Sequence, residues 1–183
     1  MTFSASLGLD STKFCSGMYN ILNFTTTQIQ DCIICLQSNA TNNLTLRSQI
    51  SPDNTMPDEK ALGDAFLNTI FPKDQVTGAS CKAFVRNLQK SLVGNMTSEE
   101  VQKSIEKNLK DHYLVVMMNY GAWRKDFLGG YDWEFGKQEA RVLMYAIGTD
   151  NIYSIPDQEQ PMPPIPSILD TLKNETKKGF LMF

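Results

Sequence analysis

Hydrophobic residues recur at intervals of three or four positions along most of this 183-residue chain. Between Ser11 and Ile147 that spacing predicts a series of amphipathic helices, because 3.6 residues complete one helical turn; the alternation typical of strands is scarce. Residues that favour helix starts stand at several of the expected positions. The expected helices begin near Asp10 or Ser11, Thr25, Asp58, Ser80, the capping box Thr97–Glu100, Asp111 and Trp133.

The expected helix from about Asp111 to Phe127 differs from the others because it is apolar on most of its sides. A helix that is apolar all round is usually central to its domain, so we expect this one to be among the most buried. It contains the longest apolar run of the chain, Tyr113–Met118, which is much too short to span a membrane. Both tryptophans and the only histidine lie between Lys110 and Pro156. Such an aromatic cluster marks either a core or an interface.

Two stretches interrupt the helical pattern. Ser38–Pro57 is polar and rich in Asn and Thr, which predicts a long surface loop. Towards the C-terminus, five prolines between Pro156 and Pro166 favour an extended polyproline conformation over a surface. The pattern therefore predicts a single all-α domain of several helices over residues 1–183, in which residues 156–183 form a proline-rich tail that wraps a surface.

Composition and charge narrow the class of protein. Hydrophobic residues make up 42% of the chain and charged residues 20%, as in an ordinary globular domain. The net charge is −3 and no basic stripe is present, so we expect no nucleic-acid partner. The first residues, MTFSASLGLDSTKF, lack the basic and apolar regions of a secretory signal. A chain whose signal was removed and an ordinary cytosolic start both fit this N-terminus.

The cysteines Cys15, Cys32, Cys35 and Cys81 permit several interpretations. Cys32 and Cys35 form a C-x-x-C motif, but it falls in the middle of an expected helix rather than at a helix N-terminus, where the dipole would activate a thiol. We interpret them first as buried apolar thiols. Structural disulfides, with three possible pairings, are one alternative, and a redox or metal role is another. Five sequons give slight support to a secreted eukaryotic protein: Asn23, Asn39, Asn43, Asn95 and Asn174.

Other candidate chemistry is sparse. His112 has no serine or cysteine motif nearby that would mark it as a catalytic base, so we expect a structural or surface role. Glu134 and Glu139 have the pattern of solvated helix charges. Gly129-Gly130 lacks the spacing of a phosphate-binding loop and predicts a turn between helices. We therefore expect no catalytic, metal-binding or cofactor-binding residues in this chain.

The second half of the chain contains short motifs in an order that resembles a known protein family. Ala122-Trp123 is followed by a glycine-bearing aromatic turn, then by Leu143-Met144-Tyr145, Asp150 and Ile155-Pro156. This order resembles the small subunit of bacterial membrane-bound FAD-dependent sugar and alcohol dehydrogenases, such as the sorbitol, fructose and glucose dehydrogenase complexes. The resemblance covers mainly residues 120–156, and Arg124 stands where that family often has tyrosine.

The resemblance implies a non-catalytic escort subunit in the periplasm. In that family FAD lies in a separate large subunit, a cytochrome subunit passes electrons to the membrane, and the small subunit is thought to stabilise the large one. The corresponding expectation for this chain is a protein partner that contains FAD, a cytochrome subunit as a further candidate partner, and no membrane span of its own. A secreted or host-directed helical binding module is the alternative, and an enzyme with unrecognised residues is a third. A cytoplasmic location also stays open.

The aromatic residues around Gly129-Gly130 are best interpreted as part of a hydrophobic core, with a partner surface as the alternative. They are Trp123, Phe127, Tyr131, Trp133 and Phe135. Aromatic and methionine side chains are enriched at the centres of interfaces. A tail with four apolar residues at its end would also gain from a surface to cover, either its own domain or another subunit. The predicted partner-binding residues are Trp123, Trp133, Tyr145, Tyr153, Met162, Ile165, Phe180 and Phe183.

Overall fold

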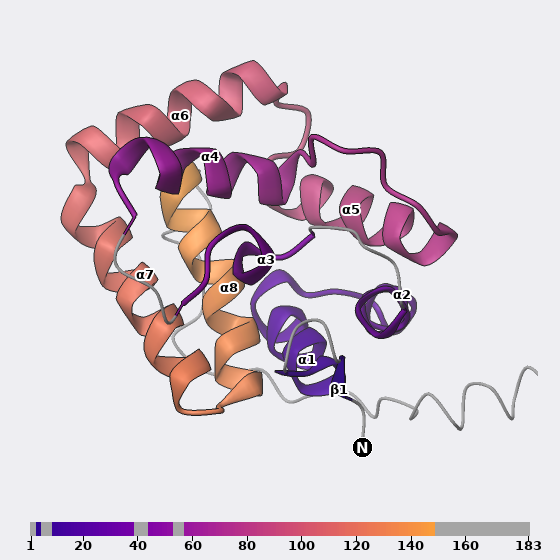
Figure 1. Cartoon of the computed structure of the whole chain (residues 1–183). Coiled ribbons are helices and arrows are strands. Elements are labelled where there is room, and N and C mark those ends of the chain that lie inside the picture. The colour runs from indigo at the N-terminus through magenta and orange to yellow at the C-terminus, as the bar shows by residue number, and fades with distance from the viewer. Residues whose placement is uncertain (1–2, 5–8, 39–43, 53–56, 149–183) are drawn as a thin grey trace, which may run out of the picture.

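The computed structural model describes residues 3–4, 9–38, 44–52 and 57–148, and this part of the chain is all-α, as the sequence predicts (Figure 1). Two two-residue strands, β1 (Phe3–Ser4) and β2 (Leu9–Asp10), pair antiparallel beside the first helix. The helices are α1 (Ser11–Leu22), α2 (Thr26–Gln37), α3 (Leu46–Gln49), α4 (Glu59–Ile70), α5 (Ala79–Leu92), α6 (Ser98–Asp111), α7 (Tyr113–Leu128) and α8 (Asp132–Ile147). The expected proline-rich tail lies outside the described residues.

Helices α1, α2, α4 and α6 begin where the capping residues predict. The Asp10 carboxylate accepts hydrogen bonds from the backbone N–H groups of Thr12 and Lys13, and so caps α1. Thr25 and Thr97 open α2 and α6 with complete capping boxes. Each box satisfies two backbone N–H groups that a helix start otherwise leaves unpaired. Local capping chemistry therefore explains these helix boundaries.

Helix α8 is the centre of the domain, and the prediction that the helix near Asp111–Phe127 would be among the most buried is wrong. Eleven of the sixteen residues of α8 are buried, whereas α7 buries only Val116, Tyr120 and Trp123. Figure 1 shows α8 running between α7 and α1, with α4 and α6 crossing near its C-terminal end. Helix α7 packs on α8 with a single stripe of residues at helical spacing. Met117 and Phe127 pack at the edges of this stripe, and the other large apolar side chains of α7 are exposed.

Helices α1 and α8 cross in very close contact. A Cβ atom added to Gly17 would overlap the backbone of Trp133, and one added to Gly136 would overlap the backbone of Phe14. The two helices therefore meet backbone to backbone, at a distance that only glycine permits. Phe14 and Phe135 pack beside the crossing with their ring centroids 5.7 Å apart.

The stretch predicted as a long surface loop, Ser38–Pro57, is partly buried. Within its described residues, Leu44 and Leu46 belong to the hydrophobic core, and α3 forms one short helical turn there. The Arg124 Nε of α7 donates a 2.7 Å hydrogen bond to the carbonyl oxygen of Pro52. The polar residues around these leucines hid two core positions from the sequence pattern, because no helical period extends across them.

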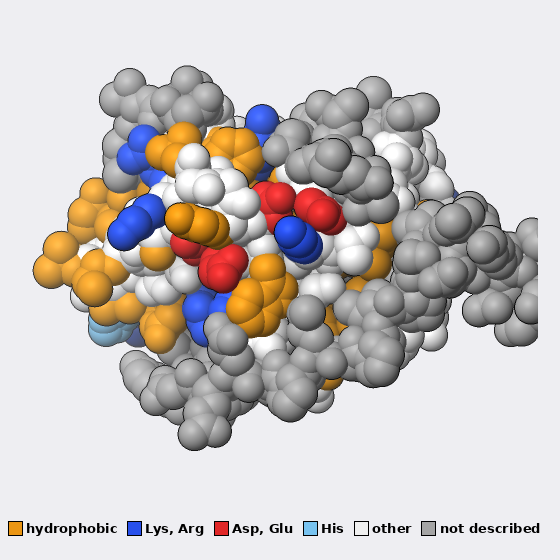
Figure 2. Space-filling model, turned by 90° about the horizontal axis from the view of Figure 1, so that it is seen from below, with side chains coloured by type: hydrophobic (Ala, Val, Ile, Leu, Met, Phe, Trp, Pro, Cys, Tyr) orange, Lys and Arg blue, Asp and Glu red, His pale blue; other side chains and the backbone are white. Residues whose placement is uncertain are grey.

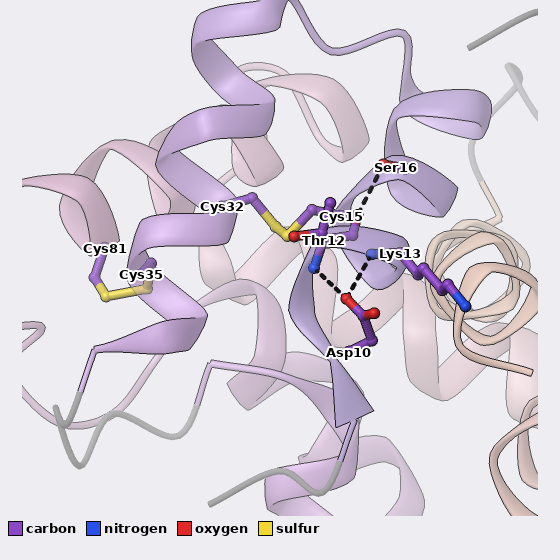
Figure 3. The surroundings of a disulfide bond; sticks show 8 residues. All are labelled: Asp10, Thr12, Lys13, Cys15, Ser16, Cys32, Cys35 and Cys81. Carbon is purple, nitrogen blue, oxygen red and sulfur yellow. Dashed lines mark hydrogen bonds between the residues drawn. A yellow bond between two sulfur atoms is a disulfide. The ribbon is translucent and has the colours of Figure 1, made fainter. Parts of the chain in front are cut away.

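Two disulfides join the N-terminal helices to one another and to α5. Cys15 of α1 pairs with Cys32 of α2, and Cys35 of α2 pairs with Cys81 of α5, so all four cysteines are oxidised (Figure 3). The interpretation of buried apolar thiols is therefore wrong, and the structural-disulfide alternative is correct. Cys32 and Cys35 do not pair with each other, because each faces a different neighbouring helix.

The glycine crossing predicts a sharp contrast between two substitutions. Gly136→Ala places a methyl group against the backbone of α1 and should destabilise the protein by roughly 1–3 kcal/mol through overpacking. Gly121→Ala is the control, because nothing lies within 4 Å of its added Cβ and alanine favours helix over glycine. Thermal unfolding followed by circular dichroism would give the two melting temperatures. Equal melting temperatures for the two variants would refute the close crossing.

The disulfides should contribute unequally to stability. They join residues 17 and 46 positions apart. In the loop-entropy model, closures of these lengths contribute about 3 and about 4 kcal/mol, respectively. Replacing Cys35 and Cys81 together with alanine should therefore lower the free energy of unfolding more than the same change at Cys15 and Cys32. Urea denaturation of both double variants measures the difference, and an undiminished stability in either would count against these pairings.

Candidate interaction surface

The outward face of α7 carries large apolar side chains that no described part of the domain covers. Leu114 is 76% exposed and Met118 is 74% exposed, and the two lie one helical turn apart. Tyr113 and Val115 are about half as exposed and extend the same surface. In Figure 2 hydrophobic side chains gather on the side of the molecule where α7 lies in Figure 1. We call Tyr113, Leu114, Val115 and Met118 the α7 apolar face.

The opposite side of α7 is firmly packed. Tyr120 stacks on Trp123 with ring centroids 5.4 Å apart, and Trp123 packs on Phe135 of α8 at 5.2 Å. The Gln138 side-chain amide of α8 also donates hydrogen bonds to the Asn119 backbone and side-chain oxygens, at 3.1 and 2.8 Å. The helix is therefore fixed in place without help from the α7 apolar face.

Glu139 is a fully buried carboxylate at the centre of this packing. Its two oxygens accept hydrogen bonds from the backbone N–H of Leu46, at 2.7 Å, and from the indole Nε1 of Trp123, at 2.8 Å. Burial raises the pKa of Glu139 to about 7, although both hydrogen bonds favour the ionised form. One side chain thus joins α3, α7 and α8. It is closed to solvent, so its geometry suits structural support rather than proton transfer to a substrate.

The prediction that Glu139 is a solvated helix charge is therefore wrong. Glu134, which shared that prediction, is exposed. The sequence held a signal that separates the two: Glu139 lies four residues after Phe135 and three before Val142, in the apolar stripe of its helix. A charged residue in such a stripe needs a buried partner. Trp123 supplies an indole donor that spacing along the sequence could not have identified.

The three described members of the predicted partner-binding set lie at different depths. Trp123 is fully buried and bound to Glu139, so it faces the core and not a partner surface. Trp133 is partly buried, and the Lys137 ammonium lies 3.8 Å from the centre of its ring. Tyr145 is also partly buried. The remaining members lie outside the described residues: Tyr153, Met162, Ile165, Phe180 and Phe183.

Other predicted positions fit simple structural roles. His112 is exposed at the junction of α6 and α7. Gly129 and Gly130 form the turn between α7 and α8, as predicted, and Gly130 adopts the left-handed backbone conformation at φ 74°. These residues position the two ends of α7.

Helices α4 and α6 line a groove of about 340 Å³. Its wall combines Leu67, Ile105 and Leu109 with the carboxylates of Glu59, Asp64 and Glu106 and the ammonium of Lys60. The mixed wall of the groove indicates no particular ligand.

Within the described residues, no group of three or more His, Cys, Asp or Glu side chains could hold a metal ion, and no helix could cross a membrane.

Comparisons with known proteins found no matching family model, no matching curated protein and no matching solved structure. The α7 apolar face stands out among the chain's own features, because it gathers four of the seven large hydrophobic side chains that are exposed in the described part of the chain.

The raised pKa of Glu139 predicts how the free energy of unfolding depends on pH. Its folded-state pKa lies above the unfolded value of 4.5, so the folded protein holds the proton more tightly. Its contribution to stability is then fully present below pH 4.5 and is lost as the pH rises through about 7. That loss amounts to about 3 kcal/mol for a shift of this size.

The variant Glu139→Gln isolates this contribution, because the amide does not titrate. We expect the variant to be less stable overall, since the amide cannot accept from both donors, but to lack the extra decline between pH 4.5 and 7. Urea denaturation across that range measures both free energies of unfolding. If the free energy of unfolding depended on pH in the same way in the wild type and in the variant, Glu139 would not titrate as described.

Proposed function

We propose that this chain is a non-catalytic, disulfide-stabilised helical module that binds a partner protein through the α7 apolar face. One observation carries the proposal: Leu114 and Met118 are about three-quarters exposed on a helix whose inner side is already fully packed. Large apolar side chains exposed side by side are uncommon on monomers and mark binding surfaces. The core does not need these residues, so their role is sought outside it.

The composition of the α7 apolar face suits a protein partner. It combines leucine, valine, methionine and tyrosine, and exposed Lys110, Asp111 and His112 stand at its N-terminal edge. An apolar centre with a polar rim is the usual anatomy of a protein interface. Gly121 and Ala122 continue the helix surface after Met118 with small side chains, which would let a partner helix approach closely. We therefore propose a partner that presents an apolar helix to α7.

The disulfides support a location in an oxidising compartment. Such bonds form and persist in secreted, periplasmic and extracellular proteins and are rare in the cytosol. Both disulfides of this chain are buried between packed helices, as expected for structural cross-links. A secreted or periplasmic binding module is therefore the proposal, in keeping with the sequence-based expectation.

The sequence resemblance offers a more specific partner, the FAD-containing large subunit of a sugar or alcohol dehydrogenase. The matching residues Trp123, Leu143 and Met144 are buried, so their similarity concerns the packing of α7 on α8 more directly than a shared surface. The escort function in a dehydrogenase complex is thus the second candidate. A flavoprotein gene beside the gene for this chain, and binding of its product, would favour it.

The proposal predicts which substitutions weaken binding. The partner would be isolated with the full chain from its native source, and its affinity for purified variants measured by calorimetry. The double variant Leu114→Gln, Met118→Gln should bind at least tenfold more weakly, because residues at interface centres each contribute more than about 1 kcal/mol. Glutamine favours helix, so the fold should remain unchanged.

Ile34→Gln is the matched control. Ile34 lies on α2, is 39% exposed, and is outside the α7 apolar face. We expect its affinity to stay close to that of the wild type. Full affinity in the double variant would contradict the proposal. Stronger binding by a chain that lacks residues 180–183 would show that the tail occupies this face, which would contradict an open partner site.

A further inference from the structure

Two sequons lie in the described part of the chain, and the fold turns both of them outward. Asn23-Phe24-Thr25 connects α1 to α2, and Asn95-Met96-Thr97 connects α5 to α6. The asparagine and threonine of each sequon are exposed, whereas the middle residue packs against the hydrophobic core. The central residue thus anchors each connection, and the two residues that define a sequon stay at the surface.

The number of sequons in the chain is higher than its composition alone would give. Five of its thirteen asparagines are followed by a threonine two positions later. Serine and threonine together make up 27 of the 183 residues, so about one asparagine in seven should have this neighbour by chance. The excess indicates that at least some sequons serve as acceptors.

We propose that Asn23 and Asn95 are N-glycosylation sites. The sugar donor is an oligosaccharide linked to a polyprenyl pyrophosphate. The carboxamide nitrogen of the asparagine forms a bond to C1 of the first sugar and loses a proton, while the bond from C1 to the pyrophosphate oxygen breaks and the lipid pyrophosphate leaves. In eukaryotic cells this transfer occurs in the lumen of the endoplasmic reticulum. Disulfides also form in that compartment, and this chain contains two.

The sites leave α7 and α8 without glycans. Neither serine nor threonine occurs between Ser104 and Thr149, so no sequon can exist on either helix. Glycans at Asn23 and Asn95 would stand at the α1–α2 and α5–α6 connections instead. The inference does not rest on the proposed binding function, although a sugar-free α7 is what a binding helix would need.

The direct test uses the full protein from its native source. Digestion with a peptide-N-glycosidase in heavy-oxygen water converts each glycosylated asparagine into an aspartate that carries heavy oxygen. Mass spectrometry of the peptides should find Asn23 and Asn95 converted in most of the molecules. If either residue is recovered chiefly as unmodified asparagine, the proposal fails for that site.

Variants secreted from a eukaryotic cell line provide a second measurement. Asn23 has φ 56° and ψ 45°, a conformation that glycine adopts easily, so Asn23→Gly removes the acceptor with little effect on the turn. Asn95→Gln does so at the other site. Each change should abolish one glycan step in gel mobility, and unchanged mobility would overturn that site.

Threonine variants supply the matched controls. Thr25 and Thr97 also cap α2 and α6 by accepting hydrogen bonds from the backbone N–H groups of Gln28 and Glu100, both at 3.2 Å. Thr25→Ser and Thr97→Ser keep both the capping oxygen and the sequon, so they should retain the glycan step. Loss of the step in these variants would mean that mobility reports folding rather than glycosylation, which would remove the support drawn from the asparagine variants.

Discussion

The backbone-to-backbone crossing of α1 over α8 is the constraint on which the rest of this fold depends. Gly17 and Gly136 allow it, and the Asp132 carboxylate of α8 accepts a hydrogen bond from the Asp10 backbone N–H just before α1. From α1 the disulfides extend the fixed framework to α2 and then to α5. From the other side of α8, Glu139 holds α7 and α3. Helix α8 therefore positions both halves of the domain.

This arrangement explains why α7 can present apolar residues to solvent without loss of order. Its inner stripe is held by aromatic stacking, by the Trp123–Glu139 hydrogen bond and by the contacts of Gln138 with Asn119. These contacts of α7 all lie on its inner side. The outer side is then free to evolve as a surface, and its exposed leucine and methionine are the residues that the proposed function uses.

Local chemistry in the sequence was sufficient to predict every described helix except the short α3, and to predict the N-terminal caps of α1, α2, α4 and α6. Thr25, Thr97 and Gly148 act through neighbours only a few residues away, so their roles can be read without tertiary structure. The central helix could not be identified in this way. Helix α7 is the more uniformly apolar of the pair, yet α8 buries Lys137, Gln138 and Glu139. Residues of other elements form the hydrogen bonds of Gln138 and Glu139. The disulfide pairing was hidden for the same reason, since each cysteine of the C-x-x-C motif faces a different helix.

The most direct test of the account is oxidative footprinting of the methionines in the full-length protein. Met118 is 74% exposed, whereas Met18 is 1% exposed and Met144 is 7% exposed. In the free protein, mild peroxide should convert Met118 to the sulfoxide well before the other two, and a bound partner should slow its oxidation selectively. Rapid oxidation of Met144 together with protection of Met118 in the free protein would contradict both the central position of α8 and the open face of α7.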